Sequence, residues 1–259
     1  MIDARAAELK DHPLWPYVRH WQLRMRIDVL DDATVRTFLD EHDGTLIGDR
    51  MRADWLRQLA KRQRWQDYLA EYPKLTTEDT ELGCFSIRAR IATGEADALS
   101  SARAHWYTGK IQPESCLPLY AAMFEQQLLG VEDVWVRVRL ALEAGNRSVA
   151  RAAVEYLPRN QRPDARQFDN IARRPQAYLA KLPLPVAGRA QRELTIYALY
   201  KAAENWPDLA AQRLAEIDAQ LPEAERNYAW GQVAMAASWK HHPATLEWFG
   251  RAREGSLND

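Results

Sequence analysis

Apolar residues recur at helical spacing along most of the chain. In one clear stripe they stand at i, i+4, i+5, i+8 and i+9, at Met51, Trp55, Leu56, Leu59 and Ala60. Similar spacing predicts helices at residues 14–30, 65–72, 82–93, 97–107, 189–205, 208–220, 223–240 and 243–252. The alternating valine, isoleucine or threonine runs that strands need do not occur. The pattern therefore predicts an all-α fold.

Turn residues divide these helices into pairs. Asp31-Asp32 supplies a helix N-cap, Gly44 and Gly94 end helices, and a second hairpin is expected to begin after Gly48. Four segments share an apolar helix end, a short polar turn and a second apolar helix: LRQLAKRQRWQDYLAEYP, IRARIATGEADALSSARAHW, VRLALEAGNRSVARAAVEYLP and LYKAAENWPDLAAQRLAEIDAQLP. Such units bury their apolar faces only by stacking. Because the turns are unevenly spaced, a regular tetratricopeptide array is disfavoured.

We therefore expect one domain over residues 1–259, a curved superhelix (α-solenoid) of irregular stacked helical hairpins. A proline-rich segment at 159–188 interrupts the pattern. Short helices are expected inside it, around Phe168, Ile171, Tyr178 and Leu182.

The turn WYTGKIQP, at residues 106–113, is hard to explain as generic helical filler. Gly109 is predicted to end one helix in the left-handed conformation, and Pro113 to open the next at its first position. Cys116 then falls about one turn into the new helix, while Cys84 lies near the start of helix 82–93. Neighbouring helices could bring the two sulfurs together, but the residues alone leave both a buried thiol pair and a disulfide open.

Composition is that of a water-soluble fold with a substantial core, with 47% hydrophobic residues and a mean hydropathy of −0.51. No apolar run approaches the ~20 residues of a membrane span, and the N-terminus lacks the features of a secretory signal. Either a signal was removed or the protein is cytosolic. The net charge of −1 gives no global attraction to nucleic acid. Basic residues gather at 50–64 among Asp49, Asp54 and Asp67, which predicts a solvated mixed-charge helix.

Candidate chemistry is sparse. Adjacent residues on a helix point about 100° apart, and His241-His242 occupy the turn before Pro243; the cysteines lack a CxxC spacing, so we expect no metal site. No phosphate loop is present, and we expect no cofactor. Glu78, Asp79 and Glu81 stand at a helix start, where capping explains them without catalysis. Eight of the tryptophans fall on apolar stripes and are expected in the core: Trp21, Trp55, Trp65, Trp106, Trp135, Trp206, Trp230 and Trp239. One or two exposed tryptophans would be enough to stack on sugars.

The segments HWYTGKIQPESCLPLY and RLALEAGN, with Cys84 upstream, resemble the superhelical N-terminal region of the soluble lytic murein transglycosylases. HPLWPYVRHWQLR and VRTFLDEHDGTLIGDRMRADWLRQLAKRQRWQDYLAEYP extend the resemblance, and YAWGQVAMAASWKHHPATLEWFGRA continues it more weakly. It implies a Cys84–Cys116 disulfide, a periplasmic location, a lysozyme-like catalytic domain as partner and contact with peptidoglycan glycan strands. The family cleaves murein glycan strands with a 1,6-anhydromuramic product.

The family's catalytic motifs, a Glu-Ser-x-Phe helix and a Gly-Leu-Met-Gln segment, are not found in this sequence. We therefore expect a fragment or excised domain that supports a catalytic domain and is inactive alone, with no catalytic residue of its own. The alternative interpretation is a stand-alone helical-repeat module that binds a protein or peptide.

Overall fold

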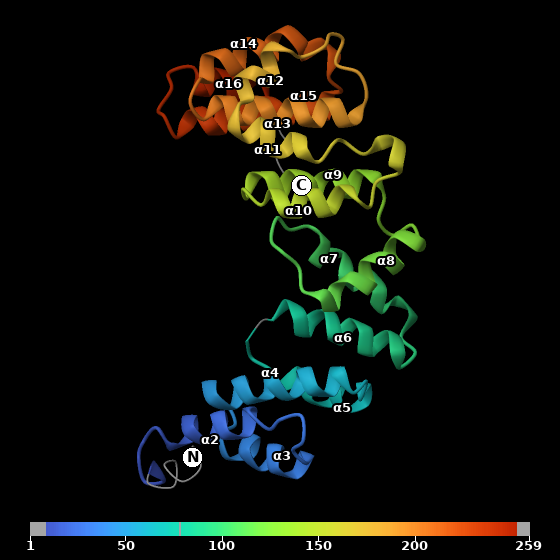
Figure 1. Cartoon of the computed structure of the whole chain (residues 1–259), viewed down its shortest axis with the longest axis vertical. Helices are drawn as coiled ribbons and strands as arrows, with labels where there is room; N and C mark the ends of the chain where they lie inside the picture. Colours follow the sequence, from blue (N-terminus) through green and yellow to red (C-terminus); the bar gives the residue numbers. More distant parts are fainter. Residues whose placement is uncertain (1–8, 78, 253–259) are drawn as a thin grey trace. The chain divides into compact units, whose positions relative to one another are not determined.

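The computed structural model describes residues 9–77 and 79–252. Within them all regular secondary structure is helical and there is no strand, which confirms the all-α class (Figure 1). The chain divides into two compact units. Unit 1 comprises Met1–Trp106 and Gln112–Leu129, and unit 2 comprises Tyr107–Ile111 and Gly130–Asp259. The assignment of residues 1–259 to a single domain stays a prediction.

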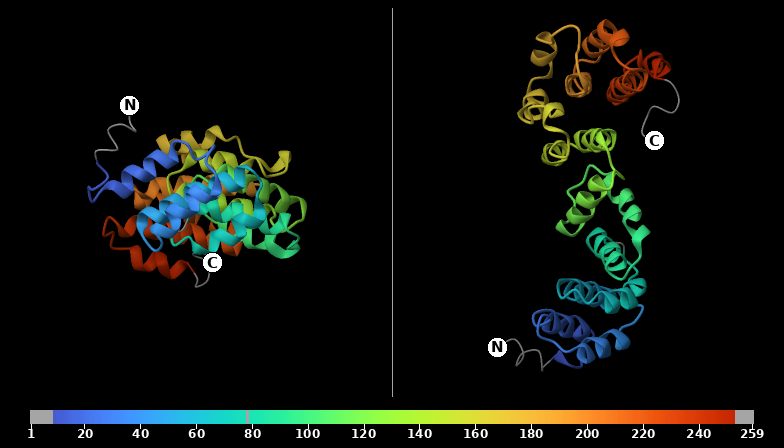
Figure 2. Two further views of the ribbon diagram at one scale, coloured as in Figure 1. Left: turned by 90° about the horizontal axis from the view of Figure 1, so that it is seen from below. Right: turned by 90° about the vertical axis from the view of Figure 1, so that its right-hand side faces the viewer.

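Unit 1 is a stack of helical hairpins in chain order. Its elements are α2 (Trp15–Arg24), α3 (Asp32–Glu41), α4 (Leu46–Lys61), α5 (Trp65–Glu71), η2 (Tyr72–Lys74), α6 (Thr80–Ala92), η3 (Ala96–Ala102), α7 (Arg103–Trp106), η4 (Glu114–Cys116) and α8 (Leu117–Glu125). Each helix from α3 to α6 packs on the next, and α4 also contacts α2 and α6. The stacking of short hairpins that the repeats predict is thus confirmed for this unit (Figure 2).

One predicted cap starts its helix, and one predicted helix start is wrong. Asp31 accepts a hydrogen bond from the Thr34 backbone N–H at 2.7 Å and begins α3, as expected. The expected start of the second hairpin after Gly48 is wrong, because α4 already begins at Leu46 and Thr45 caps it. A Cβ at Gly48 would lie 2.1 Å from the carbonyl oxygen of His42. Glycine is therefore needed inside the first turn of α4, where the preceding turn closes onto it.

The apolar stripe of α4 forms the centre of the unit 1 core. All five of its predicted residues are buried, and Met51 and Leu56 are completely excluded from solvent. Burial of one such side chain contributes roughly 1.5–3 kcal/mol. The predicted mixed-charge solvated face of this helix is wrong in part, because Arg52 and Asp49 are buried too. Neighbouring helices lie on several sides of α4, so these charged residues meet protein instead of water.

Unit 2 contains the longest run of packed helices. Its elements are α9 (Val131–Glu143), α10 (Arg147–Val154), η5 (Arg159–Gln161), α11 (Arg166–Arg173), α12 (Pro175–Ala180), α13 (Arg189–Ala203), α14 (Pro207–Ile217), η6 (Asp218–Gln220), α15 (Glu223–Ser238) and α16 (Thr245–Arg251). The pairs α9–α10, α13–α14 and α15–α16 are hairpins, and α13 also packs on α15. Buried alanines such as Ala198, Ala202 and Ala234 let these helices approach closely.

The proline-rich segment holds the short helices expected there. Phe168 and Ile171 are the buried residues of α11, and α12 contains Tyr178. Leu182 lies two residues beyond α12, in the turn that follows it. The peptide bond between Leu184 and Pro185 is cis.

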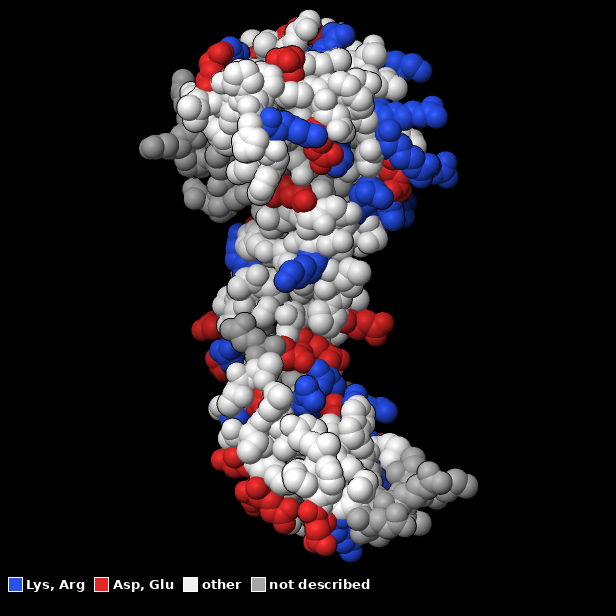
Figure 3. All heavy atoms as spheres, turned by 90° about the vertical axis from the view of Figure 1, so that its left-hand side faces the viewer, with Lys and Arg blue, Asp and Glu red and all other residues white. Residues whose placement is uncertain are grey.

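Charged side chains are unevenly spread over the surface. On the face drawn in Figure 3, Lys and Arg gather along one edge of the upper part, and Asp and Glu along one edge of the lower part. Among the described residues, no helix is both long and apolar enough to cross a membrane.

Candidate functional site

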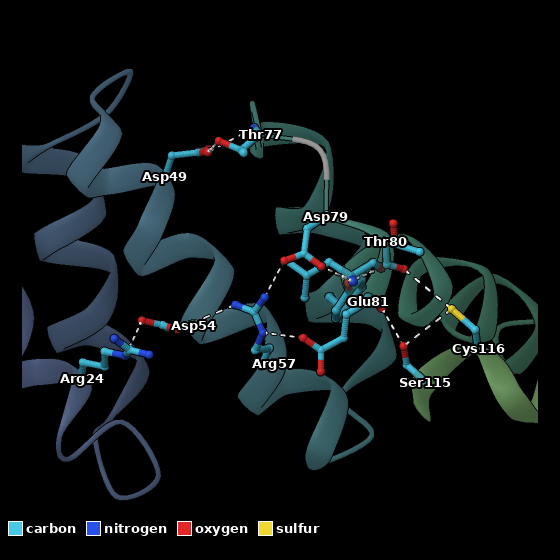
Figure 4. Close-up of polar contacts among 12 residues, drawn as sticks. Arg24, Asp49, Asp54, Arg57, Thr77, Asp79, Thr80, Glu81, Ser115 and Cys116 are labelled. Carbon is cyan, nitrogen blue, oxygen red and sulfur yellow. Dashed lines mark hydrogen bonds and ion pairs between the residues drawn. The ribbon is translucent and has the colours of Figure 1, made fainter. Parts of the chain in front are cut away.

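The two cysteines are joined in the core of unit 1. Cys84, in α6, and Cys116, the last residue of η4, form a disulfide with Cα atoms 5.1 Å apart, and neither is exposed. The hydroxyl of Ser115 donates a hydrogen bond to the Glu81 carbonyl at 3.0 Å, beside the bridge (Figure 4). The pair that the family resemblance implied is therefore bonded, and it ties α6 to the start of α8.

Ion pairs near this disulfide link α6 to α4, and α4 to α2. Arg57 of α4 donates to Glu81 Oε2 at 2.7 Å and to Asp79 (Figure 4). Asp54, one turn before Arg57, accepts from Arg24 of α2 with an N···O distance of 3.2 Å. Asp79 also caps α6 by accepting from the Leu82 backbone N–H at 3.0 Å. Asp79 thus caps the helix as expected, Glu81 lies in its first turn and pairs with Arg57, and Glu78 lies outside the described residues.

The turn at 106–113 is built differently from the prediction. Gly109 does not have a positive φ, so the left-handed conformation expected for it is wrong. A Cβ at this position would lie 2.2 Å from the Leu140 carbonyl oxygen, so glycine is needed for close approach to α9. The Asn146 side-chain amide holds the turn there by donating to the Gly109 carbonyl at 2.7 Å.

Pro113 stands immediately before the new helical element, and not at its first position as predicted. It is the N-cap of η4, with φ −60° and an extended ψ of 150°, and not the first helical residue. Its carbonyl accepts the first hydrogen bond of the new element, from the Cys116 N–H at 3.1 Å. A proline fits this position because it has no N–H to leave unsatisfied.

An open groove in unit 2 is the strongest candidate for a binding site. Its volume is about 390 Å³, within the range of small-molecule sites. Residues of α9, α13 and α15 line it, together with the residue that follows α13 and the two that follow α15: Glu143, Tyr200, Glu204, Gln232, Met235, Ala236, Trp239 and Lys240. A smaller pocket of about 20 Å³ shares Glu143, Tyr200 and Gln232 with this groove and is large enough for one water molecule.

Glu143 is the polar centre of this groove. Its Oε1 accepts hydrogen bonds from the Tyr228 hydroxyl and from Gln232 Nε2, the latter at 2.9 Å. Burial raises the pKa of the Glu143 carboxyl above its ordinary value, although the Tyr228 hydrogen bond and the charge of Arg139 oppose the shift. The Arg139 guanidinium lies 4.1 Å from the centroid of the Tyr228 ring. Sequence spacing gave no signal for this site, because its parts come from three helices.

Buried ion pairs hold the three groove helices together. Glu193 of α13 accepts two hydrogen bonds from Arg139 of α9, at 2.9 and 2.8 Å. Glu225 of α15 accepts from Arg192 at 2.6 and 3.0 Å and from Arg189 at 2.7 Å. The side chains of Glu193 and Glu225 are only 3% and 2% exposed. Paired two-pronged contacts of this kind fix geometry more strictly than single surface pairs.

The tryptophans divide into core and surface residues. The core prediction is confirmed for Trp55, Trp106, Trp135 and Trp230, and Trp65 is half-buried. It is wrong for Trp21, Trp206 and Trp239, which are 53%, 43% and 80% exposed. Trp239 is the residue that follows the end of α15. It is the tryptophan that lines the groove.

The histidine pair has separate structural contacts. His242 Nε2 lies 3.2 Å from Asp208 Oδ1, and its ring stacks on Trp248 at 4.7 Å. His241 has a positive φ of 52° in the turn before α16. Over residues 9–77 and 79–252, no group of three or more His, Cys, Asp or Glu side chains is placed to hold a metal ion.

These features define a helical-repeat domain with one disulfide and an aromatic, carboxylate-containing groove. No known family profile matches the chain. The chain is nevertheless similar to the soluble lytic murein transglycosylases. It is 28% identical over 243 residues to that of Escherichia coli (strain K12), which covers 89% of this chain and 37% of the relative. The Salmonella typhimurium (strain LT2) relative is 27% identical over 183 residues, covering 69% of this chain and 28% of the relative.

Solved structures agree with this likeness. An inactive mutant of lytic transglycosylase Slt from Pseudomonas aeruginosa matches with a TM-score of 0.74 and 27% identity, covering 95% of this chain and 40% of that one. The 70 kDa soluble lytic transglycosylase of Escherichia coli matches in fold with a TM-score of 0.67 and 22% identity, covering 96% and 41%. The resemblance seen in the sequence over most of the chain is thus confirmed. The chain spans about two fifths of the length of the curated relatives from Escherichia coli.

Proposed function

We propose that this chain is a non-catalytic superhelical scaffold domain of a peptidoglycan lytic transglycosylase. In the parent enzyme, a lysozyme-like catalytic domain cleaves murein glycan strands with a 1,6-anhydromuramic product. This domain supports the catalytic domain and contacts peptidoglycan strands in the periplasm. The observation that carries the proposal is the likeness in sequence and fold over about nine tenths of this chain.

Two features of unit 1 support this function. The Cys84–Cys116 disulfide fits an oxidising compartment such as the periplasm, since thiols in the cytosol are kept reduced. Asp79 and Glu81, the acidic residues nearest the bridge, are both bonded to Arg57. Their oxygen atoms therefore hold helices together instead of offering a proton to a glycosidic bond.

A binding and product assay on purified sacculi tests the proposal. We expect the chain to be retained on sacculi above a helical-repeat control protein of similar size and net charge. We also expect it to release no 1,6-anhydromuropeptides, measured by chromatography of the soluble fraction. Absence of retention would remove the peptidoglycan contact, and release of anhydro products by this chain alone would refute the non-catalytic role.

A titration of thiols separates the periplasmic domain from the alternative, a stand-alone peptide-binding module of the cytosol. Protein is purified without reductant from its native host and then denatured in the presence of a thiol reagent. No free thiol is expected for the scaffold domain, whereas two free thiols would favour the cytosolic module.

A further inference from the structure

The groove of unit 2 has an exposed aromatic wall. Trp239 is 80% exposed, although its neighbours on α15, Ala236 and Ala237, are buried. Half-buried Tyr200 and exposed Met235 line the same groove. A large flat ring that is exposed to water lacks contacts with apolar neighbours. A ligand with an apolar face would supply those contacts.

The polar atoms of this groove are mainly hydrogen-bond acceptors. Glu143 Oε1 already accepts from Tyr228 and Gln232, but Oε2 has no hydrogen-bond partner in the described part of the chain. Because Gln232 Nε2 donates to Glu143, the amide oxygen of Gln232 is left to accept. A ligand that satisfies both acceptors must carry donors on one edge, such as hydroxyl groups.

The charges of the groove are close to balance. Glu204 is paired with Lys201, whose ammonium nitrogen bonds Glu204 Oε1, and Lys240 adds a positive charge at the lining. The Glu143 carboxylate supplies the matching negative charge, and the charge of Arg139 favours that ionised form. A balanced site of this kind suits an uncharged ligand better than a strong cation or anion.

We propose that this groove binds a pyranose ring of a glycan strand. The C–H face of the sugar stacks on Trp239, its hydroxyl groups donate to Glu143 Oε2 and the Gln232 amide oxygen, and Lys240 donates to a sugar oxygen. The choice of an N-acetylated glycan as ligand rests on the proposed function.

Titration with N-acetylglucosamine tetrasaccharide tests the site directly. Binding is measured by calorimetry and by the shift of the Trp239 indole N–H resonance, which is assigned from its absence in Trp239→Ala. We expect Trp239→Ala to bind about tenfold more weakly, as loss of a stacked aromatic contact predicts. Glu143→Gln keeps the shape but presents an amide, and we expect a weakening of about fivefold.

The matched control is Trp21→Ala, which removes another exposed tryptophan, 53% exposed, from unit 1. We expect it to bind as the unaltered chain does, and circular dichroism checks that each variant is folded. No shift of the Trp239 resonance at saturating sugar, or equal loss in Trp21→Ala and Trp239→Ala, would overturn the site. So would a shift produced by choline but not by the sugar.

The same variants distinguish failure of this sugar site from failure of the proposed function. If the chain is retained on sacculi and Trp239→Ala is retained equally, the glycan contact stands but lies elsewhere. If the tetrasaccharide binds at Trp239 while sacculi do not retain the chain, the sugar site stands and the proposed function fails.

Discussion

The two units of this chain are held together by different chemistry. In unit 1 a disulfide joins α6 to η4, and Arg57, which pairs with Glu81 of α6, is 34% exposed. Unit 2 has no cysteine, and its longest helices are joined through Glu193 and Glu225, whose side chains are almost completely buried. Unit 1 also has a buried ion pair, Arg52 with Glu71, whose side chains are 5% and 10% exposed. One unit therefore combines a covalent bond with both buried and partly exposed ion pairs, and the other relies on buried carboxylates paired with arginines.

Helix length explains this difference. Around the disulfide the chain forms short elements, with four residues in α7 and three in η4, which bury little apolar surface each. A cross-link compensates by restricting the unfolded chain. In unit 2, α13 and α15 contain 15 and 16 residues and pack through alanines, so buried charge pairs can be fixed between them without a covalent bond.

Removal of a buried ion-pair partner is the largest expected perturbation. Glu225→Ala leaves Arg192 without its carboxylate and Arg189 with fewer partners, and we expect unit 2 to lose about 3–5 kcal/mol of unfolding free energy. Urea unfolding followed by hydrogen exchange measures this loss in α13 and α15 separately from unit 1. The control is Glu216→Ala, which removes an exposed pair with Arg213 and should cost under about 1 kcal/mol. Equal effects of the two variants would contradict a special role for burial.

Loss of the disulfide should weaken unit 1 in the same way. The sequence separation of Cys84 and Cys116 is 32 residues, and a closed loop of this length contributes about 3–4 kcal/mol in the chain-entropy model. We expect this loss of unfolding free energy in the Cys84→Ala, Cys116→Ala double variant. Hydrogen exchange should rise in α6 and α8 and stay unchanged in α13. A reductant should not change the double variant further, and a loss below about 1 kcal/mol would argue against this role.

Addition of a methyl group at Gly109 should lower the unfolding free energy by an intermediate amount. Gly109→Ala places a Cβ against the Leu140 carbonyl oxygen, and we expect unit 2 to lose about 1–3 kcal/mol as the turn moves away from α9. The control is Gly250→Ala in α16, where a Cβ would meet no atom within 4 Å. That variant should be neutral or stabilising by up to about 1 kcal/mol, because alanine favours a helix. Thermal unfolding of the two variants decides between steric and general glycine effects.

The smallest expected effect is on how the unfolding free energy of unit 2 depends on pH, and it comes from Glu143. Its folded-state pKa lies above the ordinary value of 4.5, so the folded state binds a proton more readily than the unfolded state. Stability from this group is present below about pH 4.5 and is lost as the pH rises through the folded-state pKa. Glu143→Gln should flatten this part of the stability curve, measured by urea unfolding between pH 4 and 7. An unchanged slope would assign the pH dependence to another group.

Local signals in the sequence were enough to predict most elements. The spacing of Met51, Trp55 and Leu56 predicts the buried face of α4, and Asp31 and Gly94 mark helix ends that the structure contains. Gly109 shows the limit of such signals. A glycine after a helix favours a left-handed ending, but the need here is close approach to Leu140, which is 31 positions away along the printed sequence.

The groove could not be predicted from local pattern. Trp230 and Trp239 both stand on the apolar stripe of one helical segment, yet one is 2% and the other 80% exposed. Periodicity assigns residues to a face, but whether that face is covered depends on where the neighbouring helix ends. Glu143, Gln232 and Trp239 therefore become one site only after α9 and α15 have packed on α13.

The sequence by itself determined the helical class, the stacking of short hairpins and a family resemblance in which Cys84 and Cys116 are bonded. These follow from contacts between residues a few positions apart and from a specific turn. The tertiary structure alone decided which charges, such as Arg52 and Glu225, leave water, and which tryptophans remain in it. The physical reason is that burial depends on both surfaces of a contact, while a sequence pattern describes one helix face at a time.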